Sequence, residues 1–246
     1  MMKTPGRAAR PRRPLLRWTV WAAAAALGVV LALVASSPLG ALNGLARSDV
    51  YRLDEGIAYG PLARQRLDVY TPTAPAATPA RGWPVAVFFY GGSWNTGERG
   101  DYRFVAAALA ERGVLAIVAD YRLYPEVRFP EFLRDAALAL AWGLENGKRL
   151  GGDPRRTFVM GHSAGGYNAA MLALDPRWLA PTGHDAKRKL AGWIGLAGPY
   201  EFLPLKPGPS QPVFFHPDYP PGTQPIDYVA GDAPPPSSPH RPTTRS

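Results

Sequence analysis

The sequence predicts an α/β fold in which a mostly parallel sheet carries helices on both faces. Continuous apolar runs at 84–90 and 114–121 are typical of strands that are buried on both sides. Between and after these runs, residues 101–113 and 130–147 have apolar side chains at helical spacing. Strands that alternate with helices in this way form a parallel sheet, with the helices packed against its two faces.

The two helices of this pattern have recognisable ends. In the first, Phe104 and Ala108 lie one turn apart on the apolar side, and Gly113 is a typical stop. In the second, Pro130 suits a first helical turn, and Gly147 suits the position that follows the last turn. Both stretches are therefore predicted to be helices that connect neighbouring strands.

The remaining strands are short and are bounded by turn-forming residues. Two stretches with alternating patterns, at 56–60 and 65–72, are predicted as edge strands. The stretches at 156–161 and 192–198 are predicted as two further strands, and a helix that begins directly after Ser163 connects them.

The distribution of charge excludes several functions. The 246-residue chain has a net charge of +9, but seven of its 28 basic residues precede the first acidic residue, Asp49. From residue 48 onward 21 basic residues accompany 19 acidic ones, so no basic surface for nucleic acid is predicted. The absence of cysteine excludes disulfides and thiolate catalysis. Four scattered histidines and the lack of a phosphate-binding motif predict neither a metal nor a cofactor.

The start of the chain is typical of a membrane anchor. Residues 1–17 hold six basic residues and no acidic one, and 18–35 are 18 residues without a charge. A spanning helix needs about 17–25 residues, whereas the apolar core of a signal peptide has about 7–15. We therefore expect an uncleaved anchor, with the basic leader in the cytoplasm and the catalytic domain on the other side. Export after signal cleavage is the alternative. Residues 36–53 are expected to form a linker.

The segment GHSAGG, at 161–166, matches the G-x-S-x-G pattern of a nucleophile elbow. It lies between a predicted strand and a predicted helix, which is the context that this motif requires. Ser163 is expected to adopt a strained backbone that presents its hydroxyl, while side chains at Gly161 or Gly165 would collide with neighbouring backbone. The N–H of Ala164 would then stabilise the oxyanion of a tetrahedral intermediate.

A second pair of glycines follows an early buried strand, in FFYGGSW at 88–94. Backbone at Gly91 and Gly92 can approach a substrate carbonyl closely because neither residue has a side chain. Their N–H groups would form the other half of an oxyanion hole, in which one donor is worth roughly 3–4 kcal/mol. A plain Gly-Gly strand exit is the structural alternative.

These motifs, in this order, resemble the α/β-hydrolase superfamily, in its branch of carboxylesterases, hormone-sensitive-lipase-like and kynurenine-formamidase-like enzymes. The resemblance covers about 54–205, expected to be the hydrolase domain, and includes DYRLYPEVRFPEF and GLAGPYEFLPL. It implies an α/β-hydrolase fold with Ser163 as nucleophile. It also implies an oxyanion hole formed by Gly91, Gly92 and Ala164. Tyr90 departs from the family, which usually has a histidine there that braces the loop.

The other members of a catalytic triad have no clear position. In this family the acid and then the histidine follow the nucleophile along the chain, but one further strand and a proline-rich stretch are all that the sequence predicts after Ser163. Glu201, directly after that strand, is the best candidate acid, and His216 is the candidate base in a lid-like or irregular segment at 206–233. The weaker candidates are His162, His184, His240, Asp227 and Asp232.

The last residues differ in character from the body of the chain. Thirteen of the 28 prolines lie between 204 and 242, and 234–246 contain no aliphatic or aromatic side chain. Such a composition predicts a disordered tail. The last strands of the fold are therefore expected to be missing, as in a truncated or frameshifted chain, and the encoding nucleotide sequence would test this.

Three functions follow from these observations. The first is a membrane-anchored serine hydrolase that acts on small-molecule carboxylic esters through an acyl-enzyme at Ser163. The second is a truncated remnant of the fold that turns over poorly, because loss of the triad base lowers activity by several orders of magnitude. The third is an amidase or formamidase with the same nucleophile and a different leaving group.

Overall fold

The computed structural model describes residues 38–73 and 79–230. The predicted basic leader (1–17), the predicted membrane segment (18–35) and the predicted tail (234–246) lie outside these ranges. No helix within the described ranges is long and apolar enough to cross a bilayer.

The stretch 36–53 is not the plain linker that the sequence predicted. It contains helix α2 (Pro38–Leu45), and strand β1 (Tyr51–Ala58) begins before residue 54, the expected start of the domain. Proline at the first position of α2 fits a helix start, because its missing N–H has no helical partner there. The prediction missed this helix because eight residues are too few to show a clear apolar period.

Six strands form one sheet in the order β1-β2-β4-β3-β5-β6. Strand β3 pairs in parallel with β4 and β5, and β5 pairs in parallel with β6. The first two pairs, β1 with β2 and β2 with β4, are antiparallel. The mostly parallel α/β fold predicted from the sequence is therefore confirmed. The strands not yet given are Arg66–Pro72 (β2), Trp83–Phe89 (β3), Leu115–Ala119 (β4), Gly152–His162 (β5) and Gly192–Leu196 (β6).

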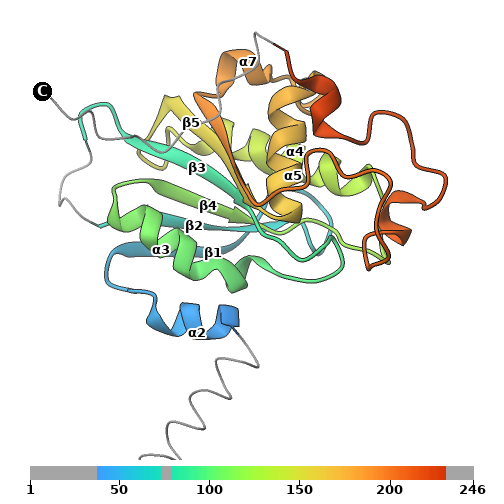
Figure 1. Cartoon of the computed structure of the whole chain (residues 1–246). Helices are drawn as coiled ribbons and strands as arrows, with labels where there is room; N and C mark the ends of the chain where they lie inside the picture. The colour runs from blue at the N-terminus through green and yellow to red at the C-terminus, as the bar shows by residue number, and fades with distance from the viewer. Residues whose placement is uncertain (1–37, 74–78, 231–246) are drawn as a thin grey trace, which may run out of the picture. The chain divides into compact units, whose positions relative to one another are not determined.

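Helices cover both faces of this sheet, as predicted (Figure 1). Helix α3 (Arg103–Glu111) packs on β2 and β4 through small side chains such as Ala106 and Ala110. Helices α4 (Glu131–Asn146) and α5 (Ala164–Leu174) contact one another and β3 on the opposite face. Every residue of α5 is buried, so the helix that follows Ser163 is held in the centre of the molecule.

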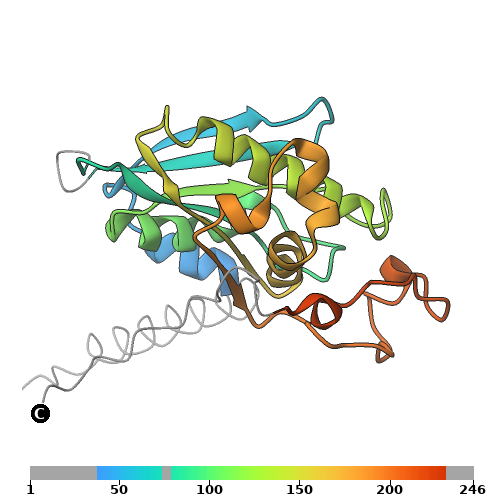
Figure 2. The same ribbon diagram turned by 90° about the horizontal axis from the view of Figure 1, so that it is seen from above.

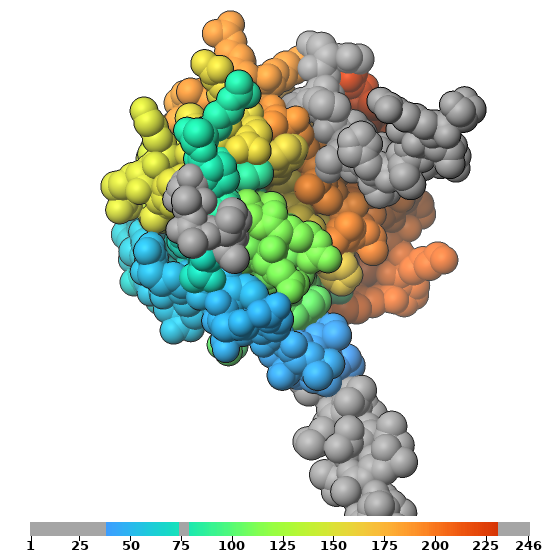
Figure 3. Space-filling view, turned by 90° about the vertical axis from the view of Figure 1, so that its left-hand side faces the viewer, coloured from blue at the N-terminus to red at the C-terminus, as the bar shows by residue number. Residues whose placement is uncertain are grey.

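The central strands are buried on both sides. Val85 and Val87 of β3 and Leu115 and Ile117 of β4 have no exposed surface. The continuous apolar runs of the sequence are explained by this position, because neither face of a central strand meets water. Figure 3 faces the end of the sheet at which the parallel strands begin. The turns that lead into β3, β4 and β5 lie on this side of the domain.

The segment after β6 is irregular but firmly anchored. It contains only two short turns of 3₁₀ helix among 197–230, Pro212–Phe214 and Pro225–Tyr228. Phe214 is fully buried, and its ring centroid lies 4.8 Å from that of Trp94 and 5.7 Å from that of Tyr167. The segment lies to one side of the sheet beyond α5 (Figure 2, orange to red). The predicted lid-like segment is therefore held in place by an aromatic core.

Short helices complete the connection between α5 and β6. They are α6 (Pro176–Leu179) and α7 (Ala186–Lys189), separated by a 3₁₀ turn at Ala180–Thr182. Each helix begins after an aspartate, Asp175 or Asp185, whose carboxylate accepts a backbone N–H of the first turn.

Candidate active site

Ser163 occupies a sharp turn between β5 and α5. Its backbone has φ 53° and ψ −117°, a combination that costs on the order of 1–3 kcal/mol for a residue other than glycine. Its N–H donates to the carbonyl of Leu196 on β6 at 2.7 Å, which ties the turn to the neighbouring strand. Ser163 itself is half-buried. The strained backbone predicted for this serine is confirmed.

The two glycines of the motif are required by their backbone neighbours. A Cβ at Gly161 would lie 2.0 Å from the carbonyl oxygen of Gly165. A Cβ at Gly165 would lie 2.0 Å from the carbonyl oxygen of Phe89 at the end of β3. The predicted collisions are therefore confirmed, and they explain how α5 starts so close to two strands.

The diglycine segment, Gly91 and Gly92, lies beside the nucleophile elbow, as predicted. A Cβ at Gly91 would lie 3.0 Å from Cβ of Ser163. Gly92 has φ 135°, and a Cβ there would lie 2.2 Å from the carbonyl oxygen of Thr96. Ser93 and Trp94 follow with φ of 52° and 58°, so strained backbone surrounds the serine from a second side.

The three predicted oxyanion donors differ in their surroundings. Ala164 is the first residue of α5, where backbone N–H groups have no helical partner and form the positive end of the helix dipole. Gly92 donates to no partner within the described residues. The N–H of Gly91 donates instead to the hydroxyl of Tyr102 at 3.3 Å. This N–H is thus already engaged, which leaves Gly92 and Ala164 as the available donors.

Tyr90, which stands where the family has histidine, is braced by an arginine. Arg64 donates to Oη of Tyr90 at 3.0 Å, to the carbonyl of Tyr121 at 2.9 Å and to the carbonyl of Gly97. The rings of Tyr90 and Tyr121 stack with centroids 4.6 Å apart, and the hydroxyl of Tyr121 donates to the carbonyl of Tyr90 at 2.8 Å. Burial raises the pKa of Tyr90, so its hydroxyl stays neutral beside Arg64.

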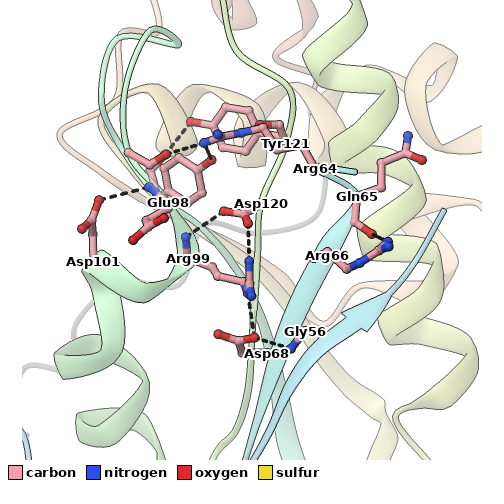
Figure 4. A network of polar contacts seen from close by, with 12 residues as sticks. Gly56, Arg64, Gln65, Arg66, Asp68, Glu98, Arg99, Asp101, Asp120 and Tyr121 are labelled. Carbon is pink, nitrogen blue, oxygen red and sulfur yellow. Dashed lines mark hydrogen bonds and ion pairs between the residues drawn. The ribbon is translucent and has the colours of Figure 1, made fainter. Parts of the chain in front are cut away.

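A second arginine fixes the chain that follows the diglycine segment (Figure 4). Arg99 donates to Asp120 at 2.6 Å and to Asp68 at 2.7 Å, and both carboxylates are buried. Its backbone N–H also donates to Asp120 at 2.8 Å. This cluster joins the turn before α3 to strand β2 and to the end of β4. Local sequence patterns gave no sign of it, because its members are far apart along the chain.

No hydrogen bond or ion pair links the candidate acid or the candidate base to Ser163 within the described residues. Within the described residues, no hydrogen bond joins Oγ of Ser163 to a histidine or a carboxylate. Glu201 is exposed in the turn after β6. His216 is exposed, and its Nδ1 lies 2.6 Å from Oη of Tyr219. The roles predicted for Glu201 and His216 remain predictions.

The weaker candidates have other partners or positions. Nδ1 of His162 lies 2.8 Å from Oη of Tyr102, and Nε2 of His184 lies 3.1 Å from Glu145. Asp227 is exposed. His240 and Asp232 lie outside the described residues. Among the residues that are described, no cluster of three potential metal ligands is present.

The structure resembles solved esterases. Esterase B from Lactobacillus rhamnosis matches with a TM-score of 0.60 and 23% identity, over 76% of this chain and 61% of that one. A bacterial heroin esterase matches with a TM-score of 0.53 and 28% identity, over 66% of this chain and 49% of that one. The α/β-hydrolase fold that the sequence motifs implied is thereby confirmed.

Curated relatives place the chain in the esterase/lipase branch of this fold. A probable isoprenylcysteine alpha-carbonyl methylesterase of Oryza sativa subsp. japonica is 33% identical over 153 residues, or 61% of this chain and 35% of that protein. Esterase LipC of Mycobacterium tuberculosis is 32% identical over 154 residues, or 59% of this chain and 36% of that protein. The chain thus spans about a third of the length of these relatives.

Within this branch, residues 67–236 match the sequence model of the BD-FAE family. The matched region begins in β2 and includes the diglycine segment and the nucleophile elbow. The chain belongs to the BD-FAE family.

Proposed function

We propose that this chain is a serine hydrolase that cleaves carboxylic esters through an acyl-enzyme at Ser163. The proposal rests on the strained backbone of Ser163, which lies at the end of β5 with the diglycine segment against it. Relatives that are named as esterases support the ester class of substrate.

The chemistry follows from the groups around the serine. Oγ of Ser163 attacks the ester carbonyl carbon, and the carbonyl electron pair moves to the oxygen. The N–H groups of Gly92 and Ala164 stabilise this oxyanion, because they are fixed in position before the charge develops. The intermediate then collapses with loss of the alcohol, and water hydrolyses the acyl group from Oγ. Proton transfer needs a base, for which His216 remains the candidate, and Glu201 remains the candidate acid.

A fluorophosphonate probe tests the nucleophile directly. We expect the full chain to form a covalent adduct at Ser163, identified by mass spectrometry of the labelled peptide. Ser163→Ala should abolish the adduct and the release of p-nitrophenol from short-chain p-nitrophenyl esters, since alanine has no hydroxyl to take the acyl group. An adduct of equal yield on the Ser163→Ala protein would refute the proposal. Ser48→Ala, a change of an exposed serine before β1, is the control and should be labelled like the wild type.

A poorly active remnant is the second candidate function. The observation in its favour is that Oγ of Ser163 has no histidine or carboxylate partner within the described residues. Without a base, the serine hydroxyl is a poor nucleophile at neutral pH. A folded chain that binds ester analogues but forms no adduct with the probe would support this alternative over the hydrolase.

We further propose that residues 18–35 anchor the chain in a membrane, with the hydrolase domain on the non-cytoplasmic side. The support is the uncharged stretch of 18 residues that follows a basic leader. After expression with its native start, the protein should stay in the membrane pellet after alkaline carbonate washing. Protease added to the outside of spheroplasts should degrade the domain. Release of a shortened protein into the soluble fraction would instead support signal cleavage.

A further inference from the structure

One side chain connects the two segments that surround the serine. The hydroxyl of Tyr102 accepts the N–H of Gly91 at 3.3 Å and lies 2.8 Å from Nδ1 of His162. Gly91 directly precedes the proposed donor Gly92, and His162 directly precedes Ser163. The Tyr102 hydroxyl is thus one residue away from both the oxyanion donor and the nucleophile.

The Tyr102 hydroxyl and its hydrogen bonds to Gly91 and His162 are called the Tyr102 bridge. The proton positions in this bridge follow from the atoms available. The Tyr102 hydroxyl has one proton to donate, and within the described residues Nδ1 of His162 is the acceptor in reach. A neutral imidazole that accepts this hydrogen bond at Nδ1 has its one N–H at Nε2. Burial raises the pKa of Tyr102, which the hydrogen bond from Gly91 only partly offsets, so the hydroxyl keeps its proton at neutral pH. A hydroxyl that donates to His162 is also a stronger acceptor for Gly91.

The ring of Tyr102 is held firmly enough to fix this bridge. It is 5% exposed and packs against Phe88, with centroids 5.2 Å apart, and against Phe104, with centroids 5.7 Å apart. Tyr102 also ends the 3₁₀ turn Arg99–Tyr102, whose first residue is bound to two buried carboxylates. Tyr102 is therefore held in position by contacts of its ring and of its 3₁₀ turn with residues of the sheet.

We propose that Tyr102 is a positioning residue, whose hydroxyl holds the diglycine segment at a fixed distance from the nucleophile elbow. This inference rests on the proposed function of Ser163 and of the Gly92 N–H. A Cβ at Gly91 would lie 3.0 Å from both Nδ1 of His162 and Cβ of Ser163, so the two segments already touch at the bridge. Van der Waals contact sets the smallest separation of the diglycine segment and the elbow, and the hydrogen bonds of Tyr102 prevent the two segments from moving further apart.

The test removes only the oxygen. Tyr102→Phe keeps the ring packing, and Tyr70→Phe is the matched control, because Tyr70 is also buried but lies on β2 opposite Ala116, away from the carboxyl end of β4. In full-length protein we expect Tyr102→Phe to lower the rate of fluorophosphonate labelling at saturating probe by about 10- to 100-fold. The half-saturating probe concentration should stay unchanged. The Tyr70→Phe protein should react like the wild type.

Two measurements that do not need activity accompany the labelling. In Tyr102→Phe, nitrogen NMR should show that His162 loses its preference for the Nε2–H form, and the Gly91 amide should exchange with solvent faster. Unchanged signals for both groups would overturn the bridge. A changed bridge with wild-type labelling would overturn the positioning role. If the wild-type chain is not labelled at all, the proposed function fails, while altered His162 and Gly91 signals would still support the bridge.

Discussion

Gly165→Ala is expected to prevent the nucleophile elbow from forming. The added methyl carbon would lie 2.0 Å from the carbonyl oxygen of Phe89 and 2.5 Å from that of Tyr90. Both are backbone atoms at the end of a central strand, so no side-chain rotation can relieve the overlap. Overpacking in a core costs about 1–3 kcal/mol and sometimes more. We expect the upper end of this range or beyond, with loss of fluorophosphonate labelling.

Chemical denaturation with circular dichroism measures the change in the free energy of unfolding. Gly208→Ala is the matched control, since the nearest atom to its added methyl group would be 3.9 Å away and its φ is not positive. That variant should unfold at the denaturant concentration of the wild type. A stable Gly165→Ala protein that is labelled at the normal rate would contradict the geometry described for the elbow.

Asp135→Ala is expected to lower the free energy of unfolding by about 3–5 kcal/mol, the typical cost of removing one partner from a buried ion pair. Asp135 of α4 has no exposed surface. Its carboxylate accepts from Nε of Arg122 at 2.7 Å, from the Arg122 backbone N–H at 3.0 Å and from Gln65 at 2.8 Å. Removal of the carboxylate takes the acceptor from the Gln65 amide and the Arg122 backbone N–H, and leaves the Arg122 guanidinium with Glu131 at 3.7 Å.

An exposed ion pair provides the control for this change. Glu111 lies 3.1 Å from Arg47, and both side chains are about half exposed or more. Such pairs contribute about 0–1 kcal/mol, so Glu111→Gln should change stability little. Asp135→Asn, which keeps the shape and removes the charge, should fall between the two in urea unfolding. An Asp135→Ala protein as stable as Glu111→Gln would show that Arg122 finds other partners.

Much of the fold could be predicted because local pattern and burial agree. The run at 84–90 matches β3 (Trp83–Phe89) to within one residue, since a strand covered on both faces is apolar at every position. The helix expected over 130–147 matches α4 (Glu131–Asn146) equally well. At the elbow, the G-x-S-x-G pattern even predicted the strained backbone of Ser163, because the motif describes a single local turn.

The parts that escaped prediction depend on contacts between distant residues. Arg64 reaches Tyr90, and Tyr102 reaches His162, across 26 and 60 positions. The periodicity of a helix or strand predicts which residues share a face, but it does not predict contacts between residues so far apart in the sequence. Phe214 was hidden in a proline-rich stretch that indicated a lid, although its ring is fully buried. The identity of the acid and the base also depends on contacts between distant residues, so the sequence ranked Glu201 and His216 above the other candidates without placing either beside Ser163.

The aromatic anchor of the segment after β6 has a mechanical consequence for the site. Phe214 packs on Trp94, and Trp94 follows the diglycine segment by two residues. Asn95, one residue further, donates to the carbonyl of Pro209 in the same segment. Any displacement of that segment would remove these contacts from the loop that contains Gly92, the proposed oxyanion donor. The position of Gly92 relative to Ser163 therefore depends on the packing of a segment that is distant in the sequence, so a core substitution at Phe214 would alter the geometry proposed for the oxyanion hole.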